Sequence, residues 1–178
     1  MKKLLLLILF SLPHLLPAQL IINELMTNNV SALMDDSYNY SMWVELYNPS
    51  STTSYNQTVY YFTDDLTQPR KWCPASKLIS PGGYSVLWFE RSGRTGHANF
   101  KLEPKGSTLY LLNAFGQIID RVDYPEQYRN ISYGRKKDGG SEWGYFNQHS
   151  AGKTNNGKIS ASQRCAKPEF NTTGFITP

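Results

Sequence analysis

The chain has 178 residues, of which 40% are hydrophobic, 13% aromatic and 18% charged, and its formal net charge is +4. This length makes one domain the default, and these proportions exclude a disordered chain, collagen, a coiled coil and a polytopic membrane protein. Twelve tyrosines, with Val, Ile and Thr recurring between Gly, Pro and Asn, favour strands over helices.

Residues 1–18 have the layout of a secretory signal peptide. Lys2 and Lys3 give a positive start, 4–12 is a nearly continuous apolar run, and Ala18 supplies a small residue before the expected cleavage point. The apolar run is too short to span a membrane. The sequence therefore predicts a secreted, periplasmic or cell-surface protein. Removing the two lysines leaves 16 basic against 14 acidic residues, a charge of +2, which does not by itself indicate a nucleic-acid partner.

Short predicted strands separated by turn signals make up the body of the chain. No window of eleven or more residues has apolar residues repeating at the spacing of a helix. One helical turn at 30–34 is the most helix that the pattern allows. Turn signals at 113–116 and 138–140 each predict a β-hairpin. The predicted strands are, in chain order, 20–26, 42–47, 58–63, 84–90, 108–112, 117–124, 132–136 and 142–146. The sequence thus predicts an all-β fold, an antiparallel β-sandwich or barrel of about seven to nine strands.

The composition changes after residue 151. Gly, Asn and Ser dominate up to residue 163, as in a linker, and apolar residues return only at 167–175. We therefore expect one domain over 19–157. For 158–178 we expect a linker and the start of a following domain, or an arm that folds back onto the sandwich.

Several short motifs follow one another along the chain. They are IINELM at 21–26, WVELYNP at 43–49, YYFTDD at 60–65, Trp72, ISPGGY at 79–84, VLW at 86–88, GQIID at 116–120, SYGR at 132–135 and GKTN at 152–155. In this order they resemble the lamin tail domain, an immunoglobulin-like module of nuclear lamins that also occurs in secreted bacterial proteins. KPEF at 167–170, with Gly174 and Phe175, resembles the start of the fibronectin-like domain found near chitobiase-type enzymes. The resemblance implies an immunoglobulin-like sandwich at the front of a longer surface protein.

Three acidic side chains fall within predicted strands. Glu24 and Glu45 lie on strands that are candidate neighbours, and two carboxylates at a suitable separation can hydrolyse glycosides. We favour a structural role, in which both acids pair with amides or arginines, because the fold implies no deep cleft. Asp120 shares the apolar register of its strand, so its carboxylate needs a partner. We expect that partner to be an arginine or a turn amide rather than a metal.

No catalytic motif and no cofactor or metal site stands out in the sequence. Asp35-Asp36 and Asp64-Asp65 are calcium candidates, but neither follows the alternation of an EF-hand loop, so solvated turns are the favoured interpretation. His97 and His149 lie in predicted loops, and neither has a nucleophilic residue at a sequence spacing that indicates a catalytic pair.

Aromatic and basic residues supply the candidate binding surfaces. Trp43 and Trp72 sit at strand ends as candidate sugar contacts, whereas Trp88 suits the core. The densest basic cluster consists of Arg135, Lys136 and Lys137, with Trp143 nearby. It is a candidate binding surface for nucleic acid or an anionic glycan. A charged hairpin edge that discourages strand addition is the favoured interpretation of this cluster.

Cys73 and Cys165 form a candidate disulfide in an exported chain. A bridge would close a loop of roughly 90 residues and stabilise the fold by about 4 kcal/mol. Two separate buried thiols are the alternative.

These observations predict an exported, non-catalytic module for adhesion, spacing or protein interaction at the cell surface, whose partner is a protein or a glycan. The alternative is a carbohydrate-binding module of a polysaccharide-degrading system. A small glycosidase, with Glu24 and Glu45 as its acids, is the third hypothesis.

Overall fold

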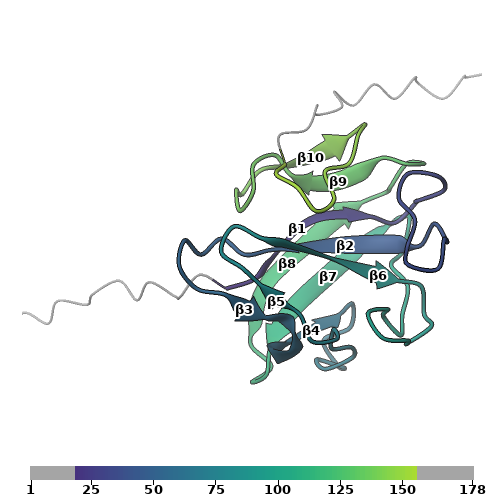
Figure 1. The fold of residues 1–178 in the computed structure, drawn as a ribbon. Helices are drawn as coiled ribbons and strands as arrows, with labels where there is room; N and C mark the ends of the chain where they lie inside the picture. Colours follow the sequence, from purple (N-terminus) through teal and green to yellow (C-terminus); the bar gives the residue numbers. More distant parts are fainter. Residues whose placement is uncertain (1–18, 156–178) are drawn as a thin grey trace, which may run out of the picture.

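The computed structural model describes residues 19–155 (Figure 1). The predicted signal peptide, the segment 158–178 and Cys165 lie outside these residues. The elements are, in chain order, β1 (Ile21–Met26), β2 (Met42–Tyr47), β3 (Tyr55–Asn56), the 3-10 helix η1 (Gln57–Val59), β4 (Tyr60–Thr63), β5 (Leu78–Ile79), β6 (Tyr84–Phe89), β7 (Gly106–Asn113), β8 (Ile118–Pro125), β9 (Ser132–Arg135) and β10 (Trp143–Phe146). No helix in this part of the chain is long and apolar enough to cross a membrane.

The strands form two main antiparallel sheets. One has five strands in the order β10-β9-β1-β2-β6, and the other has three in the order β4-β7-β8; β3 and β5 pair separately. In Figure 1 the strands β7 and β8 cross behind β1 and β2 at an angle, as two packed sheets do. The predicted all-β, immunoglobulin-like antiparallel sandwich is confirmed.

Apolar side chains from both sheets fill the space between them. Along β2, Val44 and Leu46 face this core, and the residues between them face the other side of the sheet, as the alternation of a strand requires. The core residues also include Leu25, Phe62, Leu87, Phe89, Leu109, Leu111, Val122 and Tyr124. Three aromatic rings, those of Phe62, Trp72 and Phe100, pack around Phe89. The contacts among these four rings are edge-on or tilted, with centroid distances of 5.2–5.7 Å.

Residues 147–155, which we call the C-terminal strap, cover the outer face of β1 and β2. The His149 ring packs edge-on against Trp43, with ring centroids 5.7 Å apart. The Asn155 side-chain amide donates to the backbone carbonyls of Asn23 (3.2 Å) and Arg135 (2.8 Å). Asn23 lies where the β1–β2 register shifts, so the strap is tied to a β-bulge. The sheet therefore has a second buried layer beyond the sandwich core.

Residues 30–34, where the pattern allowed at most one helical turn, contain bends at 30–32 and no helix. One local expectation was wrong. The strand predicted from residue 58 begins only at Tyr60, because the Asn56 side chain accepts a hydrogen bond from the Thr58 amide and starts the 3-10 helix instead.

Candidate functional site

The two acids considered for catalysis are sealed inside the protein. Glu24 and Glu45 are paired across β1 and β2, and each is 0% exposed. Ser132 and Ser150 donate side-chain hydrogen bonds to Glu24 at 2.5 and 2.8 Å. The Glu45 carboxylate accepts from the Asn23 side chain at 3.0 Å and from the strap amide of Gly152 at 2.5 Å. A substrate therefore has no access to either carboxylate, and the geometry supports their structural role.

Burial changes the protonation of this pair. Burial raises the pKa of Glu45 to about 8; hydrogen bonds from Asn23 and Gly152 oppose the rise, and the charges of Glu24 and Asp138 add to it. Burial also raises the pKa of Glu24, against the hydrogen bonds from Ser132 and Ser150. A perturbed pKa often marks a catalytic group, but here the strap closes off the solvent side, so the perturbation reflects packing.

Asp120 faces inward from β8 and is paired with an arginine. Both of its carboxylate oxygens lie 3.0 Å from Nη2 of Arg135, and Oδ2 also accepts from the Ile22 amide at 2.8 Å. Arg135 also donates to the backbone carbonyls of Ile22 at 2.8 Å and Gly140 at 2.5 Å. The carboxylate thus connects the three-stranded sheet to the five-stranded one.

This pairing removes Arg135 from the predicted basic surface. Arg135 is 9% exposed and points into the protein, so the interpretation of Arg135, Lys136 and Lys137 as one binding surface was wrong. Lys136 is exposed and pairs with Glu142 at 3.1 Å. Lys137 is also exposed. Two lysines on a hairpin, one of them already paired, make a weak anion site.

The tryptophans occupy other places than the sequence suggested. Trp43 is 0% exposed beneath the strap, so its assignment as a surface sugar contact was wrong. Trp72 is half-buried, and its ring packs against Phe62 and Phe89. Trp88, expected in the core, is half-buried on the outer face of β6 because Leu87 and Phe89 take the inner positions.

Trp143 is half-buried at the edge of the five-stranded sheet. Its ring stacks on Tyr133 at 5.4 Å, and the Arg135 guanidinium lies 4.8 Å from its centroid. The ring is therefore already engaged by two internal partners, which leaves it poorly suited to stacking on a sugar.

Cys73 is a half-buried thiol, and its Sγ donates to the Thr58 carbonyl at 3.2 Å. Burial raises the pKa of this thiol, which disfavours the reactive thiolate. Because Cys165 lies outside the described residues, the disulfide stays a prediction.

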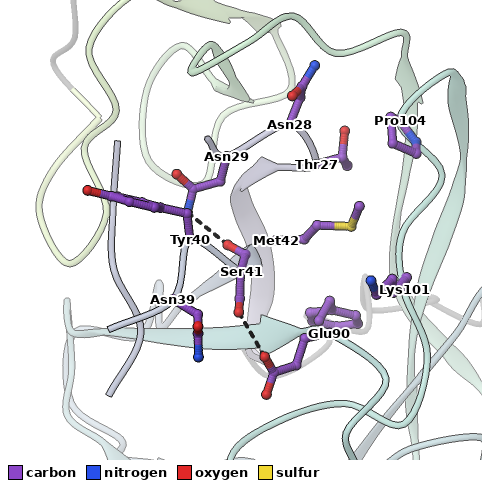
Figure 2. Close-up of a pocket in the computed structure, with 11 residues that line it drawn as sticks. Thr27, Asn28, Asn29, Asn39, Tyr40, Ser41, Met42, Glu90, Lys101 and Pro104 are labelled. Carbon is purple, nitrogen blue, oxygen red and sulfur yellow. Dashed lines mark hydrogen bonds between the residues drawn. The ribbon is translucent and has the colours of Figure 1, made fainter. Parts of the chain in front are cut away.

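An open pocket lies at one end of the sandwich, where β1 and β6 end and β2 begins. Figure 2 shows Ser41 directed toward Glu90, with Asn29 and Tyr40 on one side of the hollow and Lys101 on the other. The pocket has a volume of about 560 Å³, within the range of small-ligand sites. Its lining is mostly amide, hydroxyl and charged groups: Thr27, Asn28, Asn29, Asn39, Tyr40, Ser41, Met42, Phe89, Glu90, Lys101 and Pro104.

Side-chain hydrogen bonds to the backbone shape the loop 27–41 that forms one wall of the pocket. Asn29 Oδ1 accepts from the amides of Ala32 and Leu33, both at 3.1 Å, while its Nδ2 donates to the Ser41 carbonyl at 2.8 Å. Asp35 Oδ1 accepts from the amides two and four residues later. These local bonds hold the wall in one conformation.

A charged cluster lies directly beside the pocket. The Asp35 carboxylate is buried rather than in a solvated turn, which corrects the sequence interpretation. Arg94 lies 3.3 Å from Asp35, 3.0 Å from Asp36 and 2.9 Å from Glu90. His97 is 0% exposed, with Nε2 3.1 Å from Asp36 and Nδ1 2.7 Å from Glu90.

The two acids at the centre of this cluster are ionised at neutral pH. Burial alone would raise the pKa of Asp35, but hydrogen bonds from Asn39, Ser41 and Ser37 lower it overall. The pKa of Glu90 is likewise lowered despite burial, chiefly by hydrogen bonds from Arg94 and Ser92. The site thus combines a polar hollow, lined by amides, hydroxyls, Glu90 and Lys101, with a cluster of acidic groups beside it.

Sequence reasoning missed this site because its parts come from three separate stretches of the chain. Asn29, Ser41 and Glu90 meet only through the pairing of β2 with β6 and of β1 with β2. The one available signal was the density of Asn, Ser and Asp between 27 and 41.

A family model described as Lamin Tail Domain matches residues 16–126, more than half of the chain. Neither the curated proteins nor the solved structures gave a match. The described fold continues past the matched region, because β9 pairs with β1 inside the same sheet. Lamin tail domains are immunoglobulin-like modules of a non-enzymatic family, in keeping with the sealed carboxylates found here. On the family match and the sandwich together, the chain belongs to the lamin tail domain family.

Proposed function

We propose that the protein is an exported, non-catalytic lamin tail module that binds a partner at the cell surface, in adhesion, spacing or protein interaction. Export rests on the signal-peptide layout of residues 1–18. The lack of catalysis rests on the burial of Glu24 and Glu45, the best acid–base candidates of the chain.

The observation that carries the binding role is the polar pocket in Figure 2. Its open side presents side chains that form hydrogen bonds with a partner without reacting with it. Tyr40 and Lys101 are suited to such contacts because their side chains lie at the rim of the pocket. They take no part in the hydrogen bonds by which Asn29 and Asp35 hold the loop 27–41.

Attachment of protein-coated beads to cells of the source organism tests this role. Tyr40→Ala and Lys101→Ala should each reduce attachment while leaving the melting temperature unchanged. Phe115→Ala is the matched control, because Phe115 is 87% exposed on the β7–β8 turn, away from the pocket. Equal attachment by all three variants would contradict the role of the pocket. Full-length protein with an uncleaved N-terminus, found only inside the cell, would contradict export.

One observation favours carbohydrate as the partner. The asparagine side chains around the hollow offer both hydrogen-bond donors and acceptors to sugar hydroxyls. The candidate sugar contacts are therefore the polar residues that line this pocket, in place of Trp43 and Trp72.

A glycan array distinguishes the two kinds of partner. For a carbohydrate-binding module, the protein binds one class of glycan, and Tyr40→Ala loses that binding while Phe115→Ala retains it. Bead attachment without any array signal would instead identify a protein partner.

A further inference from the structure

We propose that Asp35, Glu90 and His97 form a binding site for a divalent transition-metal ion of the Zn²⁺ type. This site lies beside the pocket and goes beyond the recognition role, which needs no metal. From the sequence, Asp35 was only a calcium candidate with a solvated turn as the favoured interpretation, because Glu90 and His97 lie more than 50 residues further along the chain.

The three side chains already converge. One ligand atom from each lies within 4.8 Å of the ligand atoms of the other two. Zinc bonds to nitrogen and oxygen are about 2.0–2.2 Å long, so the ligand atoms of a tetrahedral site lie about 3.4 Å apart. Small side-chain movements are therefore enough to close the site around an ion.

His97 is the observation that points to an ion rather than to an ordinary acidic cluster. Its imidazole is fully buried, and Nδ1 makes no hydrogen bond within the described residues, although it lies only 2.7 Å from Glu90 Oε1. Nε2 lies 3.1 Å from Asp36 Oδ1. With the proton on Nε2, the Nδ1 lone pair faces a carboxylate oxygen. A cation that binds both atoms, once they separate to about 3.4 Å, removes this repulsion.

The same arrangement matches the surroundings of protein-bound zinc. A histidine that ligates a metal through one nitrogen usually donates its other N–H to a carboxylate, which fixes the ring orientation. Here Asp36 is that carboxylate and Nδ1 is left as the ligand atom.

Ser41 shows a second shortage of positive partners. Its Oγ lies 2.8 Å from Asp35 Oδ2 and 2.9 Å from Glu90 Oε2. A hydroxyl carries one proton and can satisfy only one of these carboxylates at a time. The other oxygen needs a second positive partner, and for Asp35 Oδ2 that partner is Arg94 Nη2 at 3.3 Å, the cation that an entering metal ion would replace.

The charges of the cluster leave room for two positive charges. Asp35, Asp36 and Glu90 contribute −3 and Arg94 contributes +1, so the cluster carries −2 when the imidazole is uncharged. A divalent ion makes it neutral. The Arg94 side chain is 36% exposed, so its guanidinium can withdraw to solvent as the ion enters.

The ligand set selects the class of metal. Two carboxylates alone would suit Ca²⁺ or Mg²⁺, whereas an imidazole nitrogen favours Zn²⁺ and its neighbours among the transition metals. The nearest other histidine in the described chain, His149, packs on Trp43 at the strap and takes no part.

Calorimetric titration of the chelator-treated full chain with Zn²⁺ tests the site, and Co²⁺ substitution reports the coordinating atoms through its absorption spectrum. We expect one ion per chain and a Co²⁺ spectrum without thiolate bands. Glu90→Gln and His97→Gln should abolish binding, and Asp36→Asn should weaken it at least about tenfold. Glu142→Gln, which alters an exposed carboxylate in a lysine pair, should leave it unchanged.

Arg94→Gln provides a second test in case Glu90→Gln and His97→Gln, which alter buried side chains, fail to fold. It removes the competing cation, so we expect tighter Zn²⁺ binding, a gain that unfolding cannot produce. Absence of one-to-one binding, thiolate bands in the Co²⁺ spectrum, a preference for Ca²⁺, or weaker binding by Arg94→Gln would each overturn the proposal. Bead attachment and glycan binding are measured without metal, so a failed metal site leaves the proposed recognition role standing.

Discussion

The Asp120 carboxylate on β8 holds the Arg135 guanidinium on β9 with both oxygens, each 3.0 Å from Nη2. The two strands belong to different sheets, so this ion pair joins the two layers of the sandwich. Both side chains are largely buried, at 14% and 11% exposure. Removing one partner of such a pair leaves the other without compensation.

Asp120→Ala should therefore destabilise the fold by about 1–3 kcal/mol, because the Arg135 guanidinium and the Ile22 amide lose their acceptor. Urea denaturation measures the change in the free energy of unfolding. Asp123→Ala is the matched control on the same strand, since its carboxylate is 61% exposed and should contribute less than about 1 kcal/mol. Equal unfolding curves for wild type and Asp120→Ala would contradict this account.

Stability should fall as the pH rises from about 4.5 to about 8. In the unfolded chain Glu45 ionises near its ordinary pKa of 4.5, whereas in the folded protein its pKa is raised to about 8. Below pH 4.5 both states hold the proton. Between these values the unfolded state alone releases it, so the free energy of unfolding decreases by about 1.4 kcal/mol per pH unit. Above pH 8 both states are ionised and the loss is complete.

Glu45→Gln should flatten this pH dependence, measured as melting temperature against pH. Some slope should remain, because the pKa of Glu24 is raised as well. Glu142→Gln, at an exposed carboxylate, should retain the wild-type slope. A slope that is the same in Glu45→Gln and wild type would show that Glu45 ionises normally in the folded protein.

Trp43→Ala should cost about 3–5 kcal/mol, because the indole is fully buried between β2 and the C-terminal strap. Trp88→Ala should cost less, since Trp88 lies half-buried on the outer face of β6. Urea titrations of the two variants give the comparison. A similar cost for both would mean that the strap does not pack on Trp43.

A fragment covering 19–155 should fold, whereas a fragment ending at 126, where the family match stops, should not. The shorter fragment lacks β9, β10 and the strap, so Asp120 loses Arg135. Glu24 loses its two serine donors, and Glu45 loses the Gly152 amide. Dispersion of amide signals in a two-dimensional NMR spectrum reports folding. A well-dispersed spectrum from the shorter fragment would show that the lamin tail fold stands without these contacts.

Local patterns in the sequence predicted the strands well. The alternation of apolar residues gave the bounds of β2 as they occur, and Gly139 and Gly116 take the positive φ that their hairpin turns require. The inward direction of Asp120 also followed from its register with Val122, although nothing local identified its partner 15 residues later.

Contacts between distant segments explain what sequence reasoning missed. Strand alternation placed Trp43 on the outer face of its sheet, but no local signal shows that His149 covers that face. For the same reason the strand register could not reveal that Glu45 is sealed by Gly152. The pocket and the Asp35 cluster depend on loops brought together only by the completed sheet.

The place of β1 in the sheet has a mechanical consequence. β1 is the first strand of the fold, yet it lies between β9 and β2 and is antiparallel to both. A pull on the N-terminal end acts along β1, across the direction of its hydrogen bonds to both neighbours. Those bonds are then sheared together instead of being unzipped one after another. The order of the strands thus gives the domain resistance to tension applied at that end.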